Sequence, residues 1–116
     1  MKIVTYDEFV RMPEGTVFCT YEPCVFGELE IKIDKGEEFN GKYDFNGTIP
    51  LVPSFVKEEA FDIGKYEIEF TSYDNASVDY EPDGLFAILE KHEIQSLIEI
   101  LQEAIRKSEV QKNDRT

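Results

Sequence analysis

The chain has 116 residues, of which 41% are apolar, and its formal net charge at pH 7 is −13. This length and apolar content predict a single folded domain and exclude an intrinsically disordered chain. The charge argues against direct binding to nucleic acid or to an anionic membrane and favours basic proteins or cations as partners.

The negative charge is confined to residues 1–90, which contain 20 Asp and Glu but only 7 Lys and Arg, whereas residues 91–116 contain 5 of each. No apolar run is long enough to span a bilayer, and the amino terminus lacks the apolar centre of a signal peptide. We therefore expect a cytoplasmic protein. Cys19 and Cys24 are too few for a disulfide framework and are expected to be small buried hydrophobic residues.

The first predicted element is a short helix over 6–11. Thr5 and Glu8 have the spacing of a capping box, in which the threonine hydroxyl accepts a hydrogen bond from the backbone N–H three residues later. The helix should end at Arg11, because Met12 precedes a proline and Gly15 favours a turn.

Strands are predicted next, with a turn over 35–38 and an irregular connection over 50–61. In the second strand Glu28, Glu30 and Lys32 are expected to point outward, and in the fourth Tyr66, Ile68 and Phe70 inward. The predicted strands are 16–22, 24–33, 39–45, 65–71, 78–80 and 85–90.

The last predicted element is an amphipathic helix from about Lys91 to Lys107. Its apolar residues recur at helical spacing, and we expect this stripe to pack on the sheet. The predicted fold is thus α+β, with an antiparallel sheet of five or six strands, a short N-terminal helix and a long C-terminal helix packed on the sheet. Residues 1–110 form one domain in this prediction, and residues 111–116 form a flexible tail. The stripe consists of Ile94, Leu97, Ile98, Leu101, Ala104 and Ile105.

No pattern in the sequence predicts a catalytic centre, a metal site or a cofactor. Asp79, Glu81, Asp83 and Glu90 have the spacing of ligands in an EF-hand calcium loop, but the preceding residues predict a strand where a helix is required. Cys19, Cys24 and His92 are too few and too scattered for a closed zinc site. His92 is expected to be a solvated residue. We therefore expect a binding protein rather than an enzyme.

The outward carboxylates predict an acidic binding surface for a basic protein. Their concentration costs stability through repulsion, so the two explanations are a role in binding and a general role in solubility. The predicted binding surface consists of Glu28, Glu30, Glu67, Glu69, Asp79, Glu81 and Asp83.

Two parts of the chain resemble small phage and prophage proteins of unassigned role. The segments are Tyr6–Phe9, Met12–Phe18 and Tyr21–Gly27 near the start, and Leu85–Glu90 and Leu97–Leu101 near the end. The resemblance implies a protein of a bacterial host cytoplasm that inhibits a host defence factor or a nucleic-acid-handling factor by stoichiometric binding.

Two other functions fit the same resemblance. An oligomeric sponge would sequester a small nucleotide signal, with phosphate bound by Arg106, Lys107, Lys112 and Arg115. These four cations are also explained as a solvated tail that is favourable at a helix C-terminus. An immunity protein or antitoxin would instead neutralise a basic toxin through the acidic surface. A homo-oligomer is compatible with each of these functions.

Overall fold

The structure is a computed structural model, described here for residues 1–52, 63–68, 70 and 83–114. The elements in chain order are β1 (Lys2–Thr5), α1 (Tyr6–Val10), β2 (Val17–Glu22), β3 (Val25–Phe26), β4 (Glu30–Lys32), β5 (Glu37–Phe39), β6 (Lys42–Asp44), β7 (Thr48–Pro50), β8 (Leu85–Ile88) and α2 (Lys91–Asp114).

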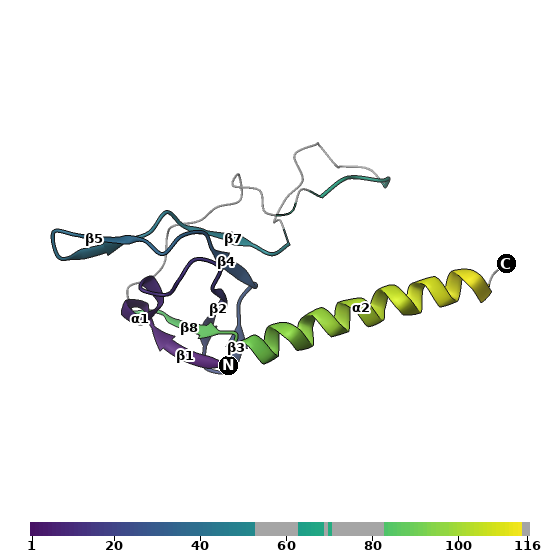
Figure 1. Ribbon diagram of the computed structural model, residues 1–116, viewed down its shortest axis with the longest axis horizontal. Coiled ribbons are helices and arrows are strands. Elements are labelled where there is room, and N and C mark those ends of the chain that lie inside the picture. The colour runs from purple at the N-terminus through teal and green to yellow at the C-terminus, as the bar shows by residue number, and fades with distance from the viewer. Residues whose placement is uncertain (53–62, 69, 71–82, 115–116) are drawn as a thin grey trace.

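The main sheet is antiparallel and has six strands. Its order is β1-β8-β2-β4-β7, with β3 paired to β2, while β5 and β6 form a separate hairpin. Figure 1 shows α1 beside this sheet and α2 extending away from it. The predicted α+β class and the antiparallel sheet are confirmed.

The core lies between α1 and one face of the sheet. Phe9 of α1 is fully buried and stacks on Phe86 of β8, with ring centroids 4.3 Å apart. Phe9 also contacts Phe18 of β2 at a centroid distance of 4.5 Å. Val4 and Val10 complete this cluster together with Ile88. A five-residue helix cannot be stable alone, so α1 depends on this burial.

The predicted cap of α1 is confirmed. The backbone N–H of Glu8 donates a hydrogen bond to the Thr5 hydroxyl at 3.3 Å, and Thr5 has the extended backbone of an N-cap residue. The helix ends at Val10, one residue before the predicted end.

We expect Thr5→Ala to lower the free energy of unfolding by about 1 kcal/mol, because one N–H of the first turn loses its acceptor. Urea denaturation measures this change. Thr5→Ser is the matched control, since serine keeps the hydroxyl that accepts the hydrogen bond. Equal effects of the two substitutions would contradict the capping role.

The hairpin β5–β6 differs from the prediction of a turn over 35–38 followed by one strand over 39–45. Its turn is Asn40-Gly41, with φ values of 51° and 78°. Two consecutive positive φ angles are the mark of the two-residue hairpin turn that an Asn-Gly pair favours. Phe39 therefore pairs with Lys42 across the turn.

The predicted strand over 24–33 is two short strands, β3 and β4. The expected outward direction of Lys32 is wrong: this side chain is 0% exposed. In the pairing of β4 with β7, Lys32 lies opposite Thr48, which is also fully buried, and Ile31 lies opposite Ile49 on the other face. Because both faces of this sheet hold apolar residues, the alternation of residue types did not identify the face covered by α1.

The predicted strand over 65–71 is not a strand where the structure describes it. Lys65–Ile68 have no regular secondary structure. Tyr66, Ile68 and Phe70, expected to point inward, are exposed. Glu69, Thr71, the predicted strand over 78–80 and the greater part of the connection over 50–61 lie outside the described residues, while Pro50 ends β7.

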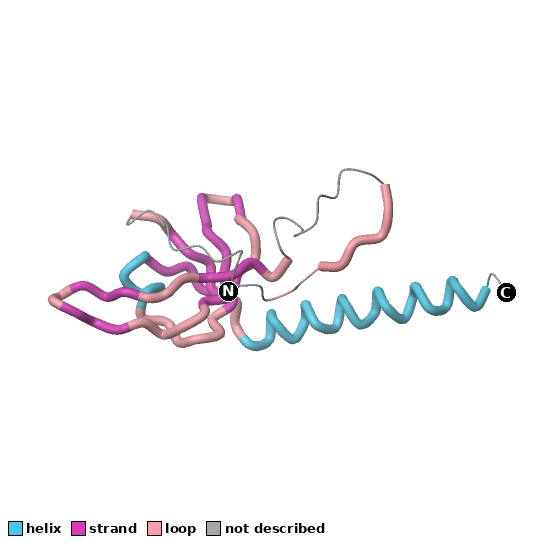
Figure 2. Tube along the Cα trace, turned by 90° about the horizontal axis from the view of Figure 1, so that it is seen from above, coloured by secondary structure: helices cyan, strands magenta, loops and turns pink. Residues whose placement is uncertain are grey.

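The helix α2 begins at Lys91 as predicted, but it continues to Asp114, through residues 111–114 of the predicted tail. Its packing on the sheet was predicted wrongly. Ile94 and Leu97 are half-buried, whereas Leu101 is 58% and Ile105 is 60% exposed. Figures 1 and 2 both show the helix leading away from the sheet. Only Leu89 and Glu90 separate β8 from α2, so the chain has no loop with which to reverse over the sheet.

The amino-terminal residue of the chain contacts the start of α2. The Met1 amino group forms ion pairs with the carboxylates of Glu93 and Glu90. The Glu90 backbone N–H donates to the Glu93 carboxylate at 3.0 Å. The hydrogen bond to Glu93 raises the pKa of the Met1 amino group, and the same bond lowers the pKa of Glu93.

Candidate functional site

Four of the seven residues of the predicted acidic surface are among the described residues, and they come from several segments of the chain. Glu28 is exposed, while Glu30 is half-buried and accepts a hydrogen bond of 3.0 Å from the hydroxyl of buried Thr48. Glu30 therefore has a structural role in β4, and its predicted role in binding stays a prediction. Glu67 and Asp83 are exposed on other segments. Glu69, Asp79 and Glu81 lie outside the described residues.

Lys32 is the titratable residue with the most specific environment, and the sequence analysis missed it. Its Nζ donates to the backbone carbonyls of Val10, Met12 and Lys35 at 2.6, 2.7 and 3.1 Å. The ammonium group also lies 4.9 Å from the centroid of the Phe45 ring. Burial lowers the pKa of Lys32, an effect that the nearby carboxylate of Asp34 opposes.

These contacts give Lys32 a structural role at the end of α1. The last carbonyls of a helix have no partner within the helix, and a cation there also interacts favourably with the helix dipole. The last turn of α1 contains no basic residue. Lys32 supplies this cation from β4, so its charge is used inside the protein and is absent from the surface.

The burial of Lys32 makes the surface of the sheet more acidic than the sequence suggests. Residues 1–52 contain ten Asp and Glu against five Lys and Arg, and one of the five is Lys32. Glu14, Glu37 and Glu38 are exposed, and no described lysine or arginine forms an ion pair with them. Glu37 and Glu38 belong to β5, whose hairpin projects at the end of the molecule opposite to α2 (Figure 1).

Of the four predicted phosphate-binding cations, the structure describes the side chains of Arg106 and Lys107. The Arg106 guanidinium is paired with the carboxylate of Glu103 on the same helix, including a hydrogen bond of 3.0 Å from Nε. Lys107 is exposed on α2. Lys112 is within the helix, and Arg115 lies outside the described residues.

Cysteine and histidine residues form no metal site in the part of the chain that the structure describes, where no group of three or more His, Cys, Asp and Glu could hold an ion. Cys19 is buried as expected, and burial raises the pKa of its thiol. Cys24 was expected to be buried but is exposed. It occupies the β2–β3 turn with a φ of 68°, after Pro23. His92 is exposed, with Nδ1 3.8 Å from a Glu90 carboxylate oxygen.

A groove between α2 and the sheet is one concave feature that could hold a ligand. It has a volume of about 840 Å³ and is lined mainly by aliphatic and aromatic side chains. The lining residues are Glu28, Leu29, Leu51, Val52, Phe70, Leu97 and Leu101. Among the described lining residues Glu28 is the only charged one, so this part of the groove suits an apolar surface that carries a positive charge beside it.

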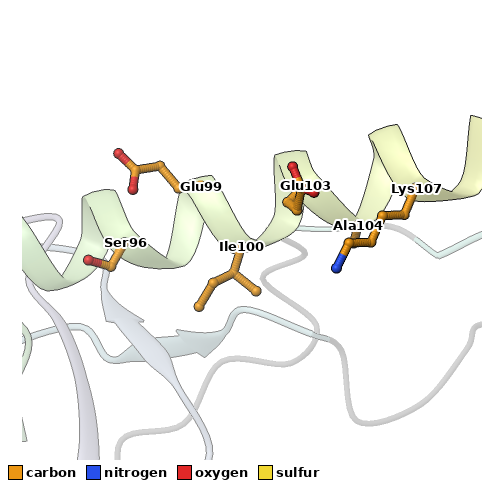
Figure 3. Close-up of a pocket in the computed structure, with 6 residues that line it drawn as sticks. All are labelled: Ser96, Glu99, Ile100, Glu103, Ala104 and Lys107. Atoms are coloured by element: carbon orange, nitrogen blue, oxygen red, sulfur yellow. The ribbon is translucent and has the colours of Figure 1, made fainter.

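A second hollow of about 690 Å³ runs along α2 itself. Figure 3 shows its six lining residues on one side of the helix, with Ile100 near the middle and Glu103 and Lys107 toward one end. Because all of its walls belong to one helix, this hollow is an open helix face and not an enclosed site.

Comparisons with known proteins give no match: no family model, curated protein or solved structure resembles the chain significantly. Among the described residues, no helix has the length and apolar character required to cross a membrane. The expected relation to phage proteins and the expected cytoplasmic location remain predictions.

Proposed function

We propose that this protein acts without catalysis, by stoichiometric binding of its acidic sheet region to a basic site on another protein. The observation that supports this proposal is the burial of Lys32, which removes a cation from a surface already rich in carboxylates. Such a surface attracts a basic partner at long range and increases the rate of association.

The contact proposed first is the projecting β5–β6 hairpin. Glu37 and Glu38 are exposed there, and the hairpin lies away from α2, so a partner would approach it without contacting the helix. The relation to phage proteins that the sequence predicts implies a host defence factor or a nucleic-acid-handling factor as the partner. A toxin neutralised by an immunity protein would use the same charge complementarity.

The nucleotide sponge has less support from the described residues. Phosphate binding requires several free cations that converge on one point. Arg106 is already paired with Glu103, and Glu103 also lines the same helix face as Lys107. We therefore retain the acidic surface as the principal proposal.

Neutralising the hairpin tests this function. We expect Glu37→Gln with Glu38→Gln to slow association with the partner several-fold and to reduce the dependence of the rate on salt. The partner is first captured by the tagged chain from a host lysate, identified by mass spectrometry and purified. Association rates are then measured by biolayer interferometry at increasing ionic strength, because charge attraction at a distance fades as the Debye length falls to about 3 Å at 1 M salt.

The matched control is Glu99→Gln with Glu109→Gln, which changes the net charge equally on exposed positions of α2. The control should leave the rate nearly unchanged. If both pairs slow association to the same extent, only the overall charge matters and the hairpin is not the contact. If neither pair has an effect, the acidic surface serves solubility alone.

A further inference from the structure

The helix α2 carries an apolar face that the rest of the chain leaves largely uncovered. Ile98 is 42%, Ile100 is 66% and Leu101 is 58% exposed. Residues three and four positions apart lie side by side on a helix, so these side chains form one continuous strip. Contiguous apolar surface of this kind marks an interaction site in a folded protein. We call it the α2 strip: Ile94, Leu97, Ile98, Ile100, Leu101, Ala104 and Ile105.

Open space adjoins this strip along its length. The groove against the sheet is lined by Leu97 and Leu101, and the second hollow is lined by Ile100 and Ala104 (Figure 3). These two pairs are neighbours on the helix surface, so the two hollows border adjacent parts of the strip. An object that fills both must be elongated, apolar on one side and parallel to α2, which are the properties of another helix.

The charges beside the strip indicate which helix fits. In a heptad with Ile94 and Leu101 at position a and Leu97 and Ala104 at position d, one flanking row reads Glu93, Ile100, Lys107. This row has opposite charges at its two ends and an apolar centre. When an identical row runs in the opposite direction, Glu93 of each copy comes close to Lys107 of the other. The Glu93 carboxylate also pairs with the Met1 amino group of its own chain, so Lys107 would be a second cation beside it.

The alternative orientation lacks this complementarity. In a parallel pair, Lys107 would lie near Lys112 of the other copy, and Glu93 near Ile98. The antiparallel pair does bring Lys91 and Lys112 of opposite copies toward each other at its two ends. That repulsion is at the ends of the pair, whereas the Glu93–Lys107 attraction occurs on both sides of the symmetry axis.

We infer that a second copy of this chain covers the α2 strip, through antiparallel pairing of the two α2 helices about a twofold axis near Ile100. Each helix then lies in the groove between the other copy's α2 and its sheet, where Glu28 is available to a cation of the incoming helix. The interface is symmetric, so the same contacts occur twice. This inference is independent of the proposed acidic contact, because the β5–β6 hairpin lies at the opposite end of each copy.

Sedimentation velocity on the full chain tests the pairing. We expect a species of twice the 13.4-kDa chain mass at micromolar concentrations. Leu101→Gln with Ile105→Gln should raise the dimer Kd by about tenfold or more, since two aliphatic side chains no longer become buried. Val110→Gln is the matched control: Val110 is also exposed, on the opposite side of α2, and its replacement should leave the Kd unchanged. Circular dichroism verifies that the variants keep their helix.

A charge reversal decides the orientation. Lys107→Glu should raise the dimer Kd several-fold, because the new carboxylate meets Glu93 of the other copy. Arg106→Glu makes the same change one residue away, on the outer side of the helix, and should have little effect. A lower Kd for Lys107→Glu would show parallel pairing, with Lys112 as its neighbour, and would overturn the antiparallel arrangement. A wild-type chain that remains monomeric at every concentration would overturn the pairing altogether.

Discussion

Replacing Lys32 by methionine should destabilise the protein by about 3 kcal/mol or more, the largest effect we expect from any change of a charged residue. Methionine preserves most of the side-chain volume but donates no hydrogen bond. The carbonyls of Val10, Met12 and Lys35 would then lose their common donor, and each buried acceptor left unpaired costs about 1–3 kcal/mol. Urea denaturation at pH 7 measures the loss.

The matched control is Lys2→Met, the same substitution at an exposed position of β1. We expect its effect to be within about 0.5 kcal/mol of zero. Equal stability of the Lys32→Met variant and the wild type would show that the cost of burying the ammonium group cancels the benefit of its hydrogen bonds.

The pH dependence of the free energy of unfolding, compared between the wild type and Lys32→Met, reports on the charge of Lys32. The native pKa is lowered by burial from the ordinary value of 10.5. Between the native pKa and 10.5, the unfolded chain therefore holds a proton that native Lys32 has released, and the free energy of unfolding rises with pH through this group. The stability difference between wild type and Lys32→Met should widen as the pH approaches 10.5. A difference that narrows over this range would mean that the native pKa is raised.

Phe9→Ala should cost about 3–5 kcal/mol, because it removes the side chain that joins α1 to the sheet. Phe9 is fully buried and contacts the rings of Phe18, Phe45 and Phe86. Removing it would leave a cavity lined by these rings and would weaken the contact between α1 and the sheet, which would then depend on Val10 and the partly buried Tyr6. The free energy of unfolding in urea is the measurement.

Phe26→Ala provides the comparison for this core substitution. Phe26 is 55% exposed and contacts Tyr21 at a centroid distance of 5.5 Å, so we expect a loss of about 1 kcal/mol or less. If Phe9→Ala were no more harmful than Phe26→Ala, the core would not depend on the contact between α1 and β8.

Local signals in the sequence predicted local structure well. The capping box at Thr5, the strand that became β2 and the start of α2 all depend on residues that are close in the sequence, and all three are confirmed. The Asn40-Gly41 pair is an equally local signal for a hairpin turn, so the prediction of the turn at residues 35–38 was wrong. That error was avoidable from the sequence alone.

Other errors arose because a pattern of apolar residues does not identify what covers it. The alternation in β4 was real, but only the hydrogen bonds of Lys32 to the carbonyls of Val10 and Met12 show which face meets α1. Likewise, the helical spacing of the α2 strip predicts an apolar face but does not identify what covers it. Only Leu89 and Glu90 link β8 to α2, and this short link directs the helix away from the sheet. The same holds for the predicted acidic residues. Glu28 and Glu30 are near each other in the sequence, but Glu28 lines the groove beside α2, whereas Glu30 accepts a hydrogen bond from Thr48.

The sheet order has a consequence for the synthesis of the protein. The strand β8, formed by residues 85–88, lies between β1 and β2, which are formed within the first 22 residues. Until the ribosome has released β8, β1 lacks its only partner in the described sheet, and Phe9 lacks the Phe86 ring on which it stacks. The main core therefore closes late, by contacts between distant parts of the chain, which makes folding slow. During translation, the acidic first 90 residues remain exposed, and their mutual repulsion opposes aggregation of the growing chains.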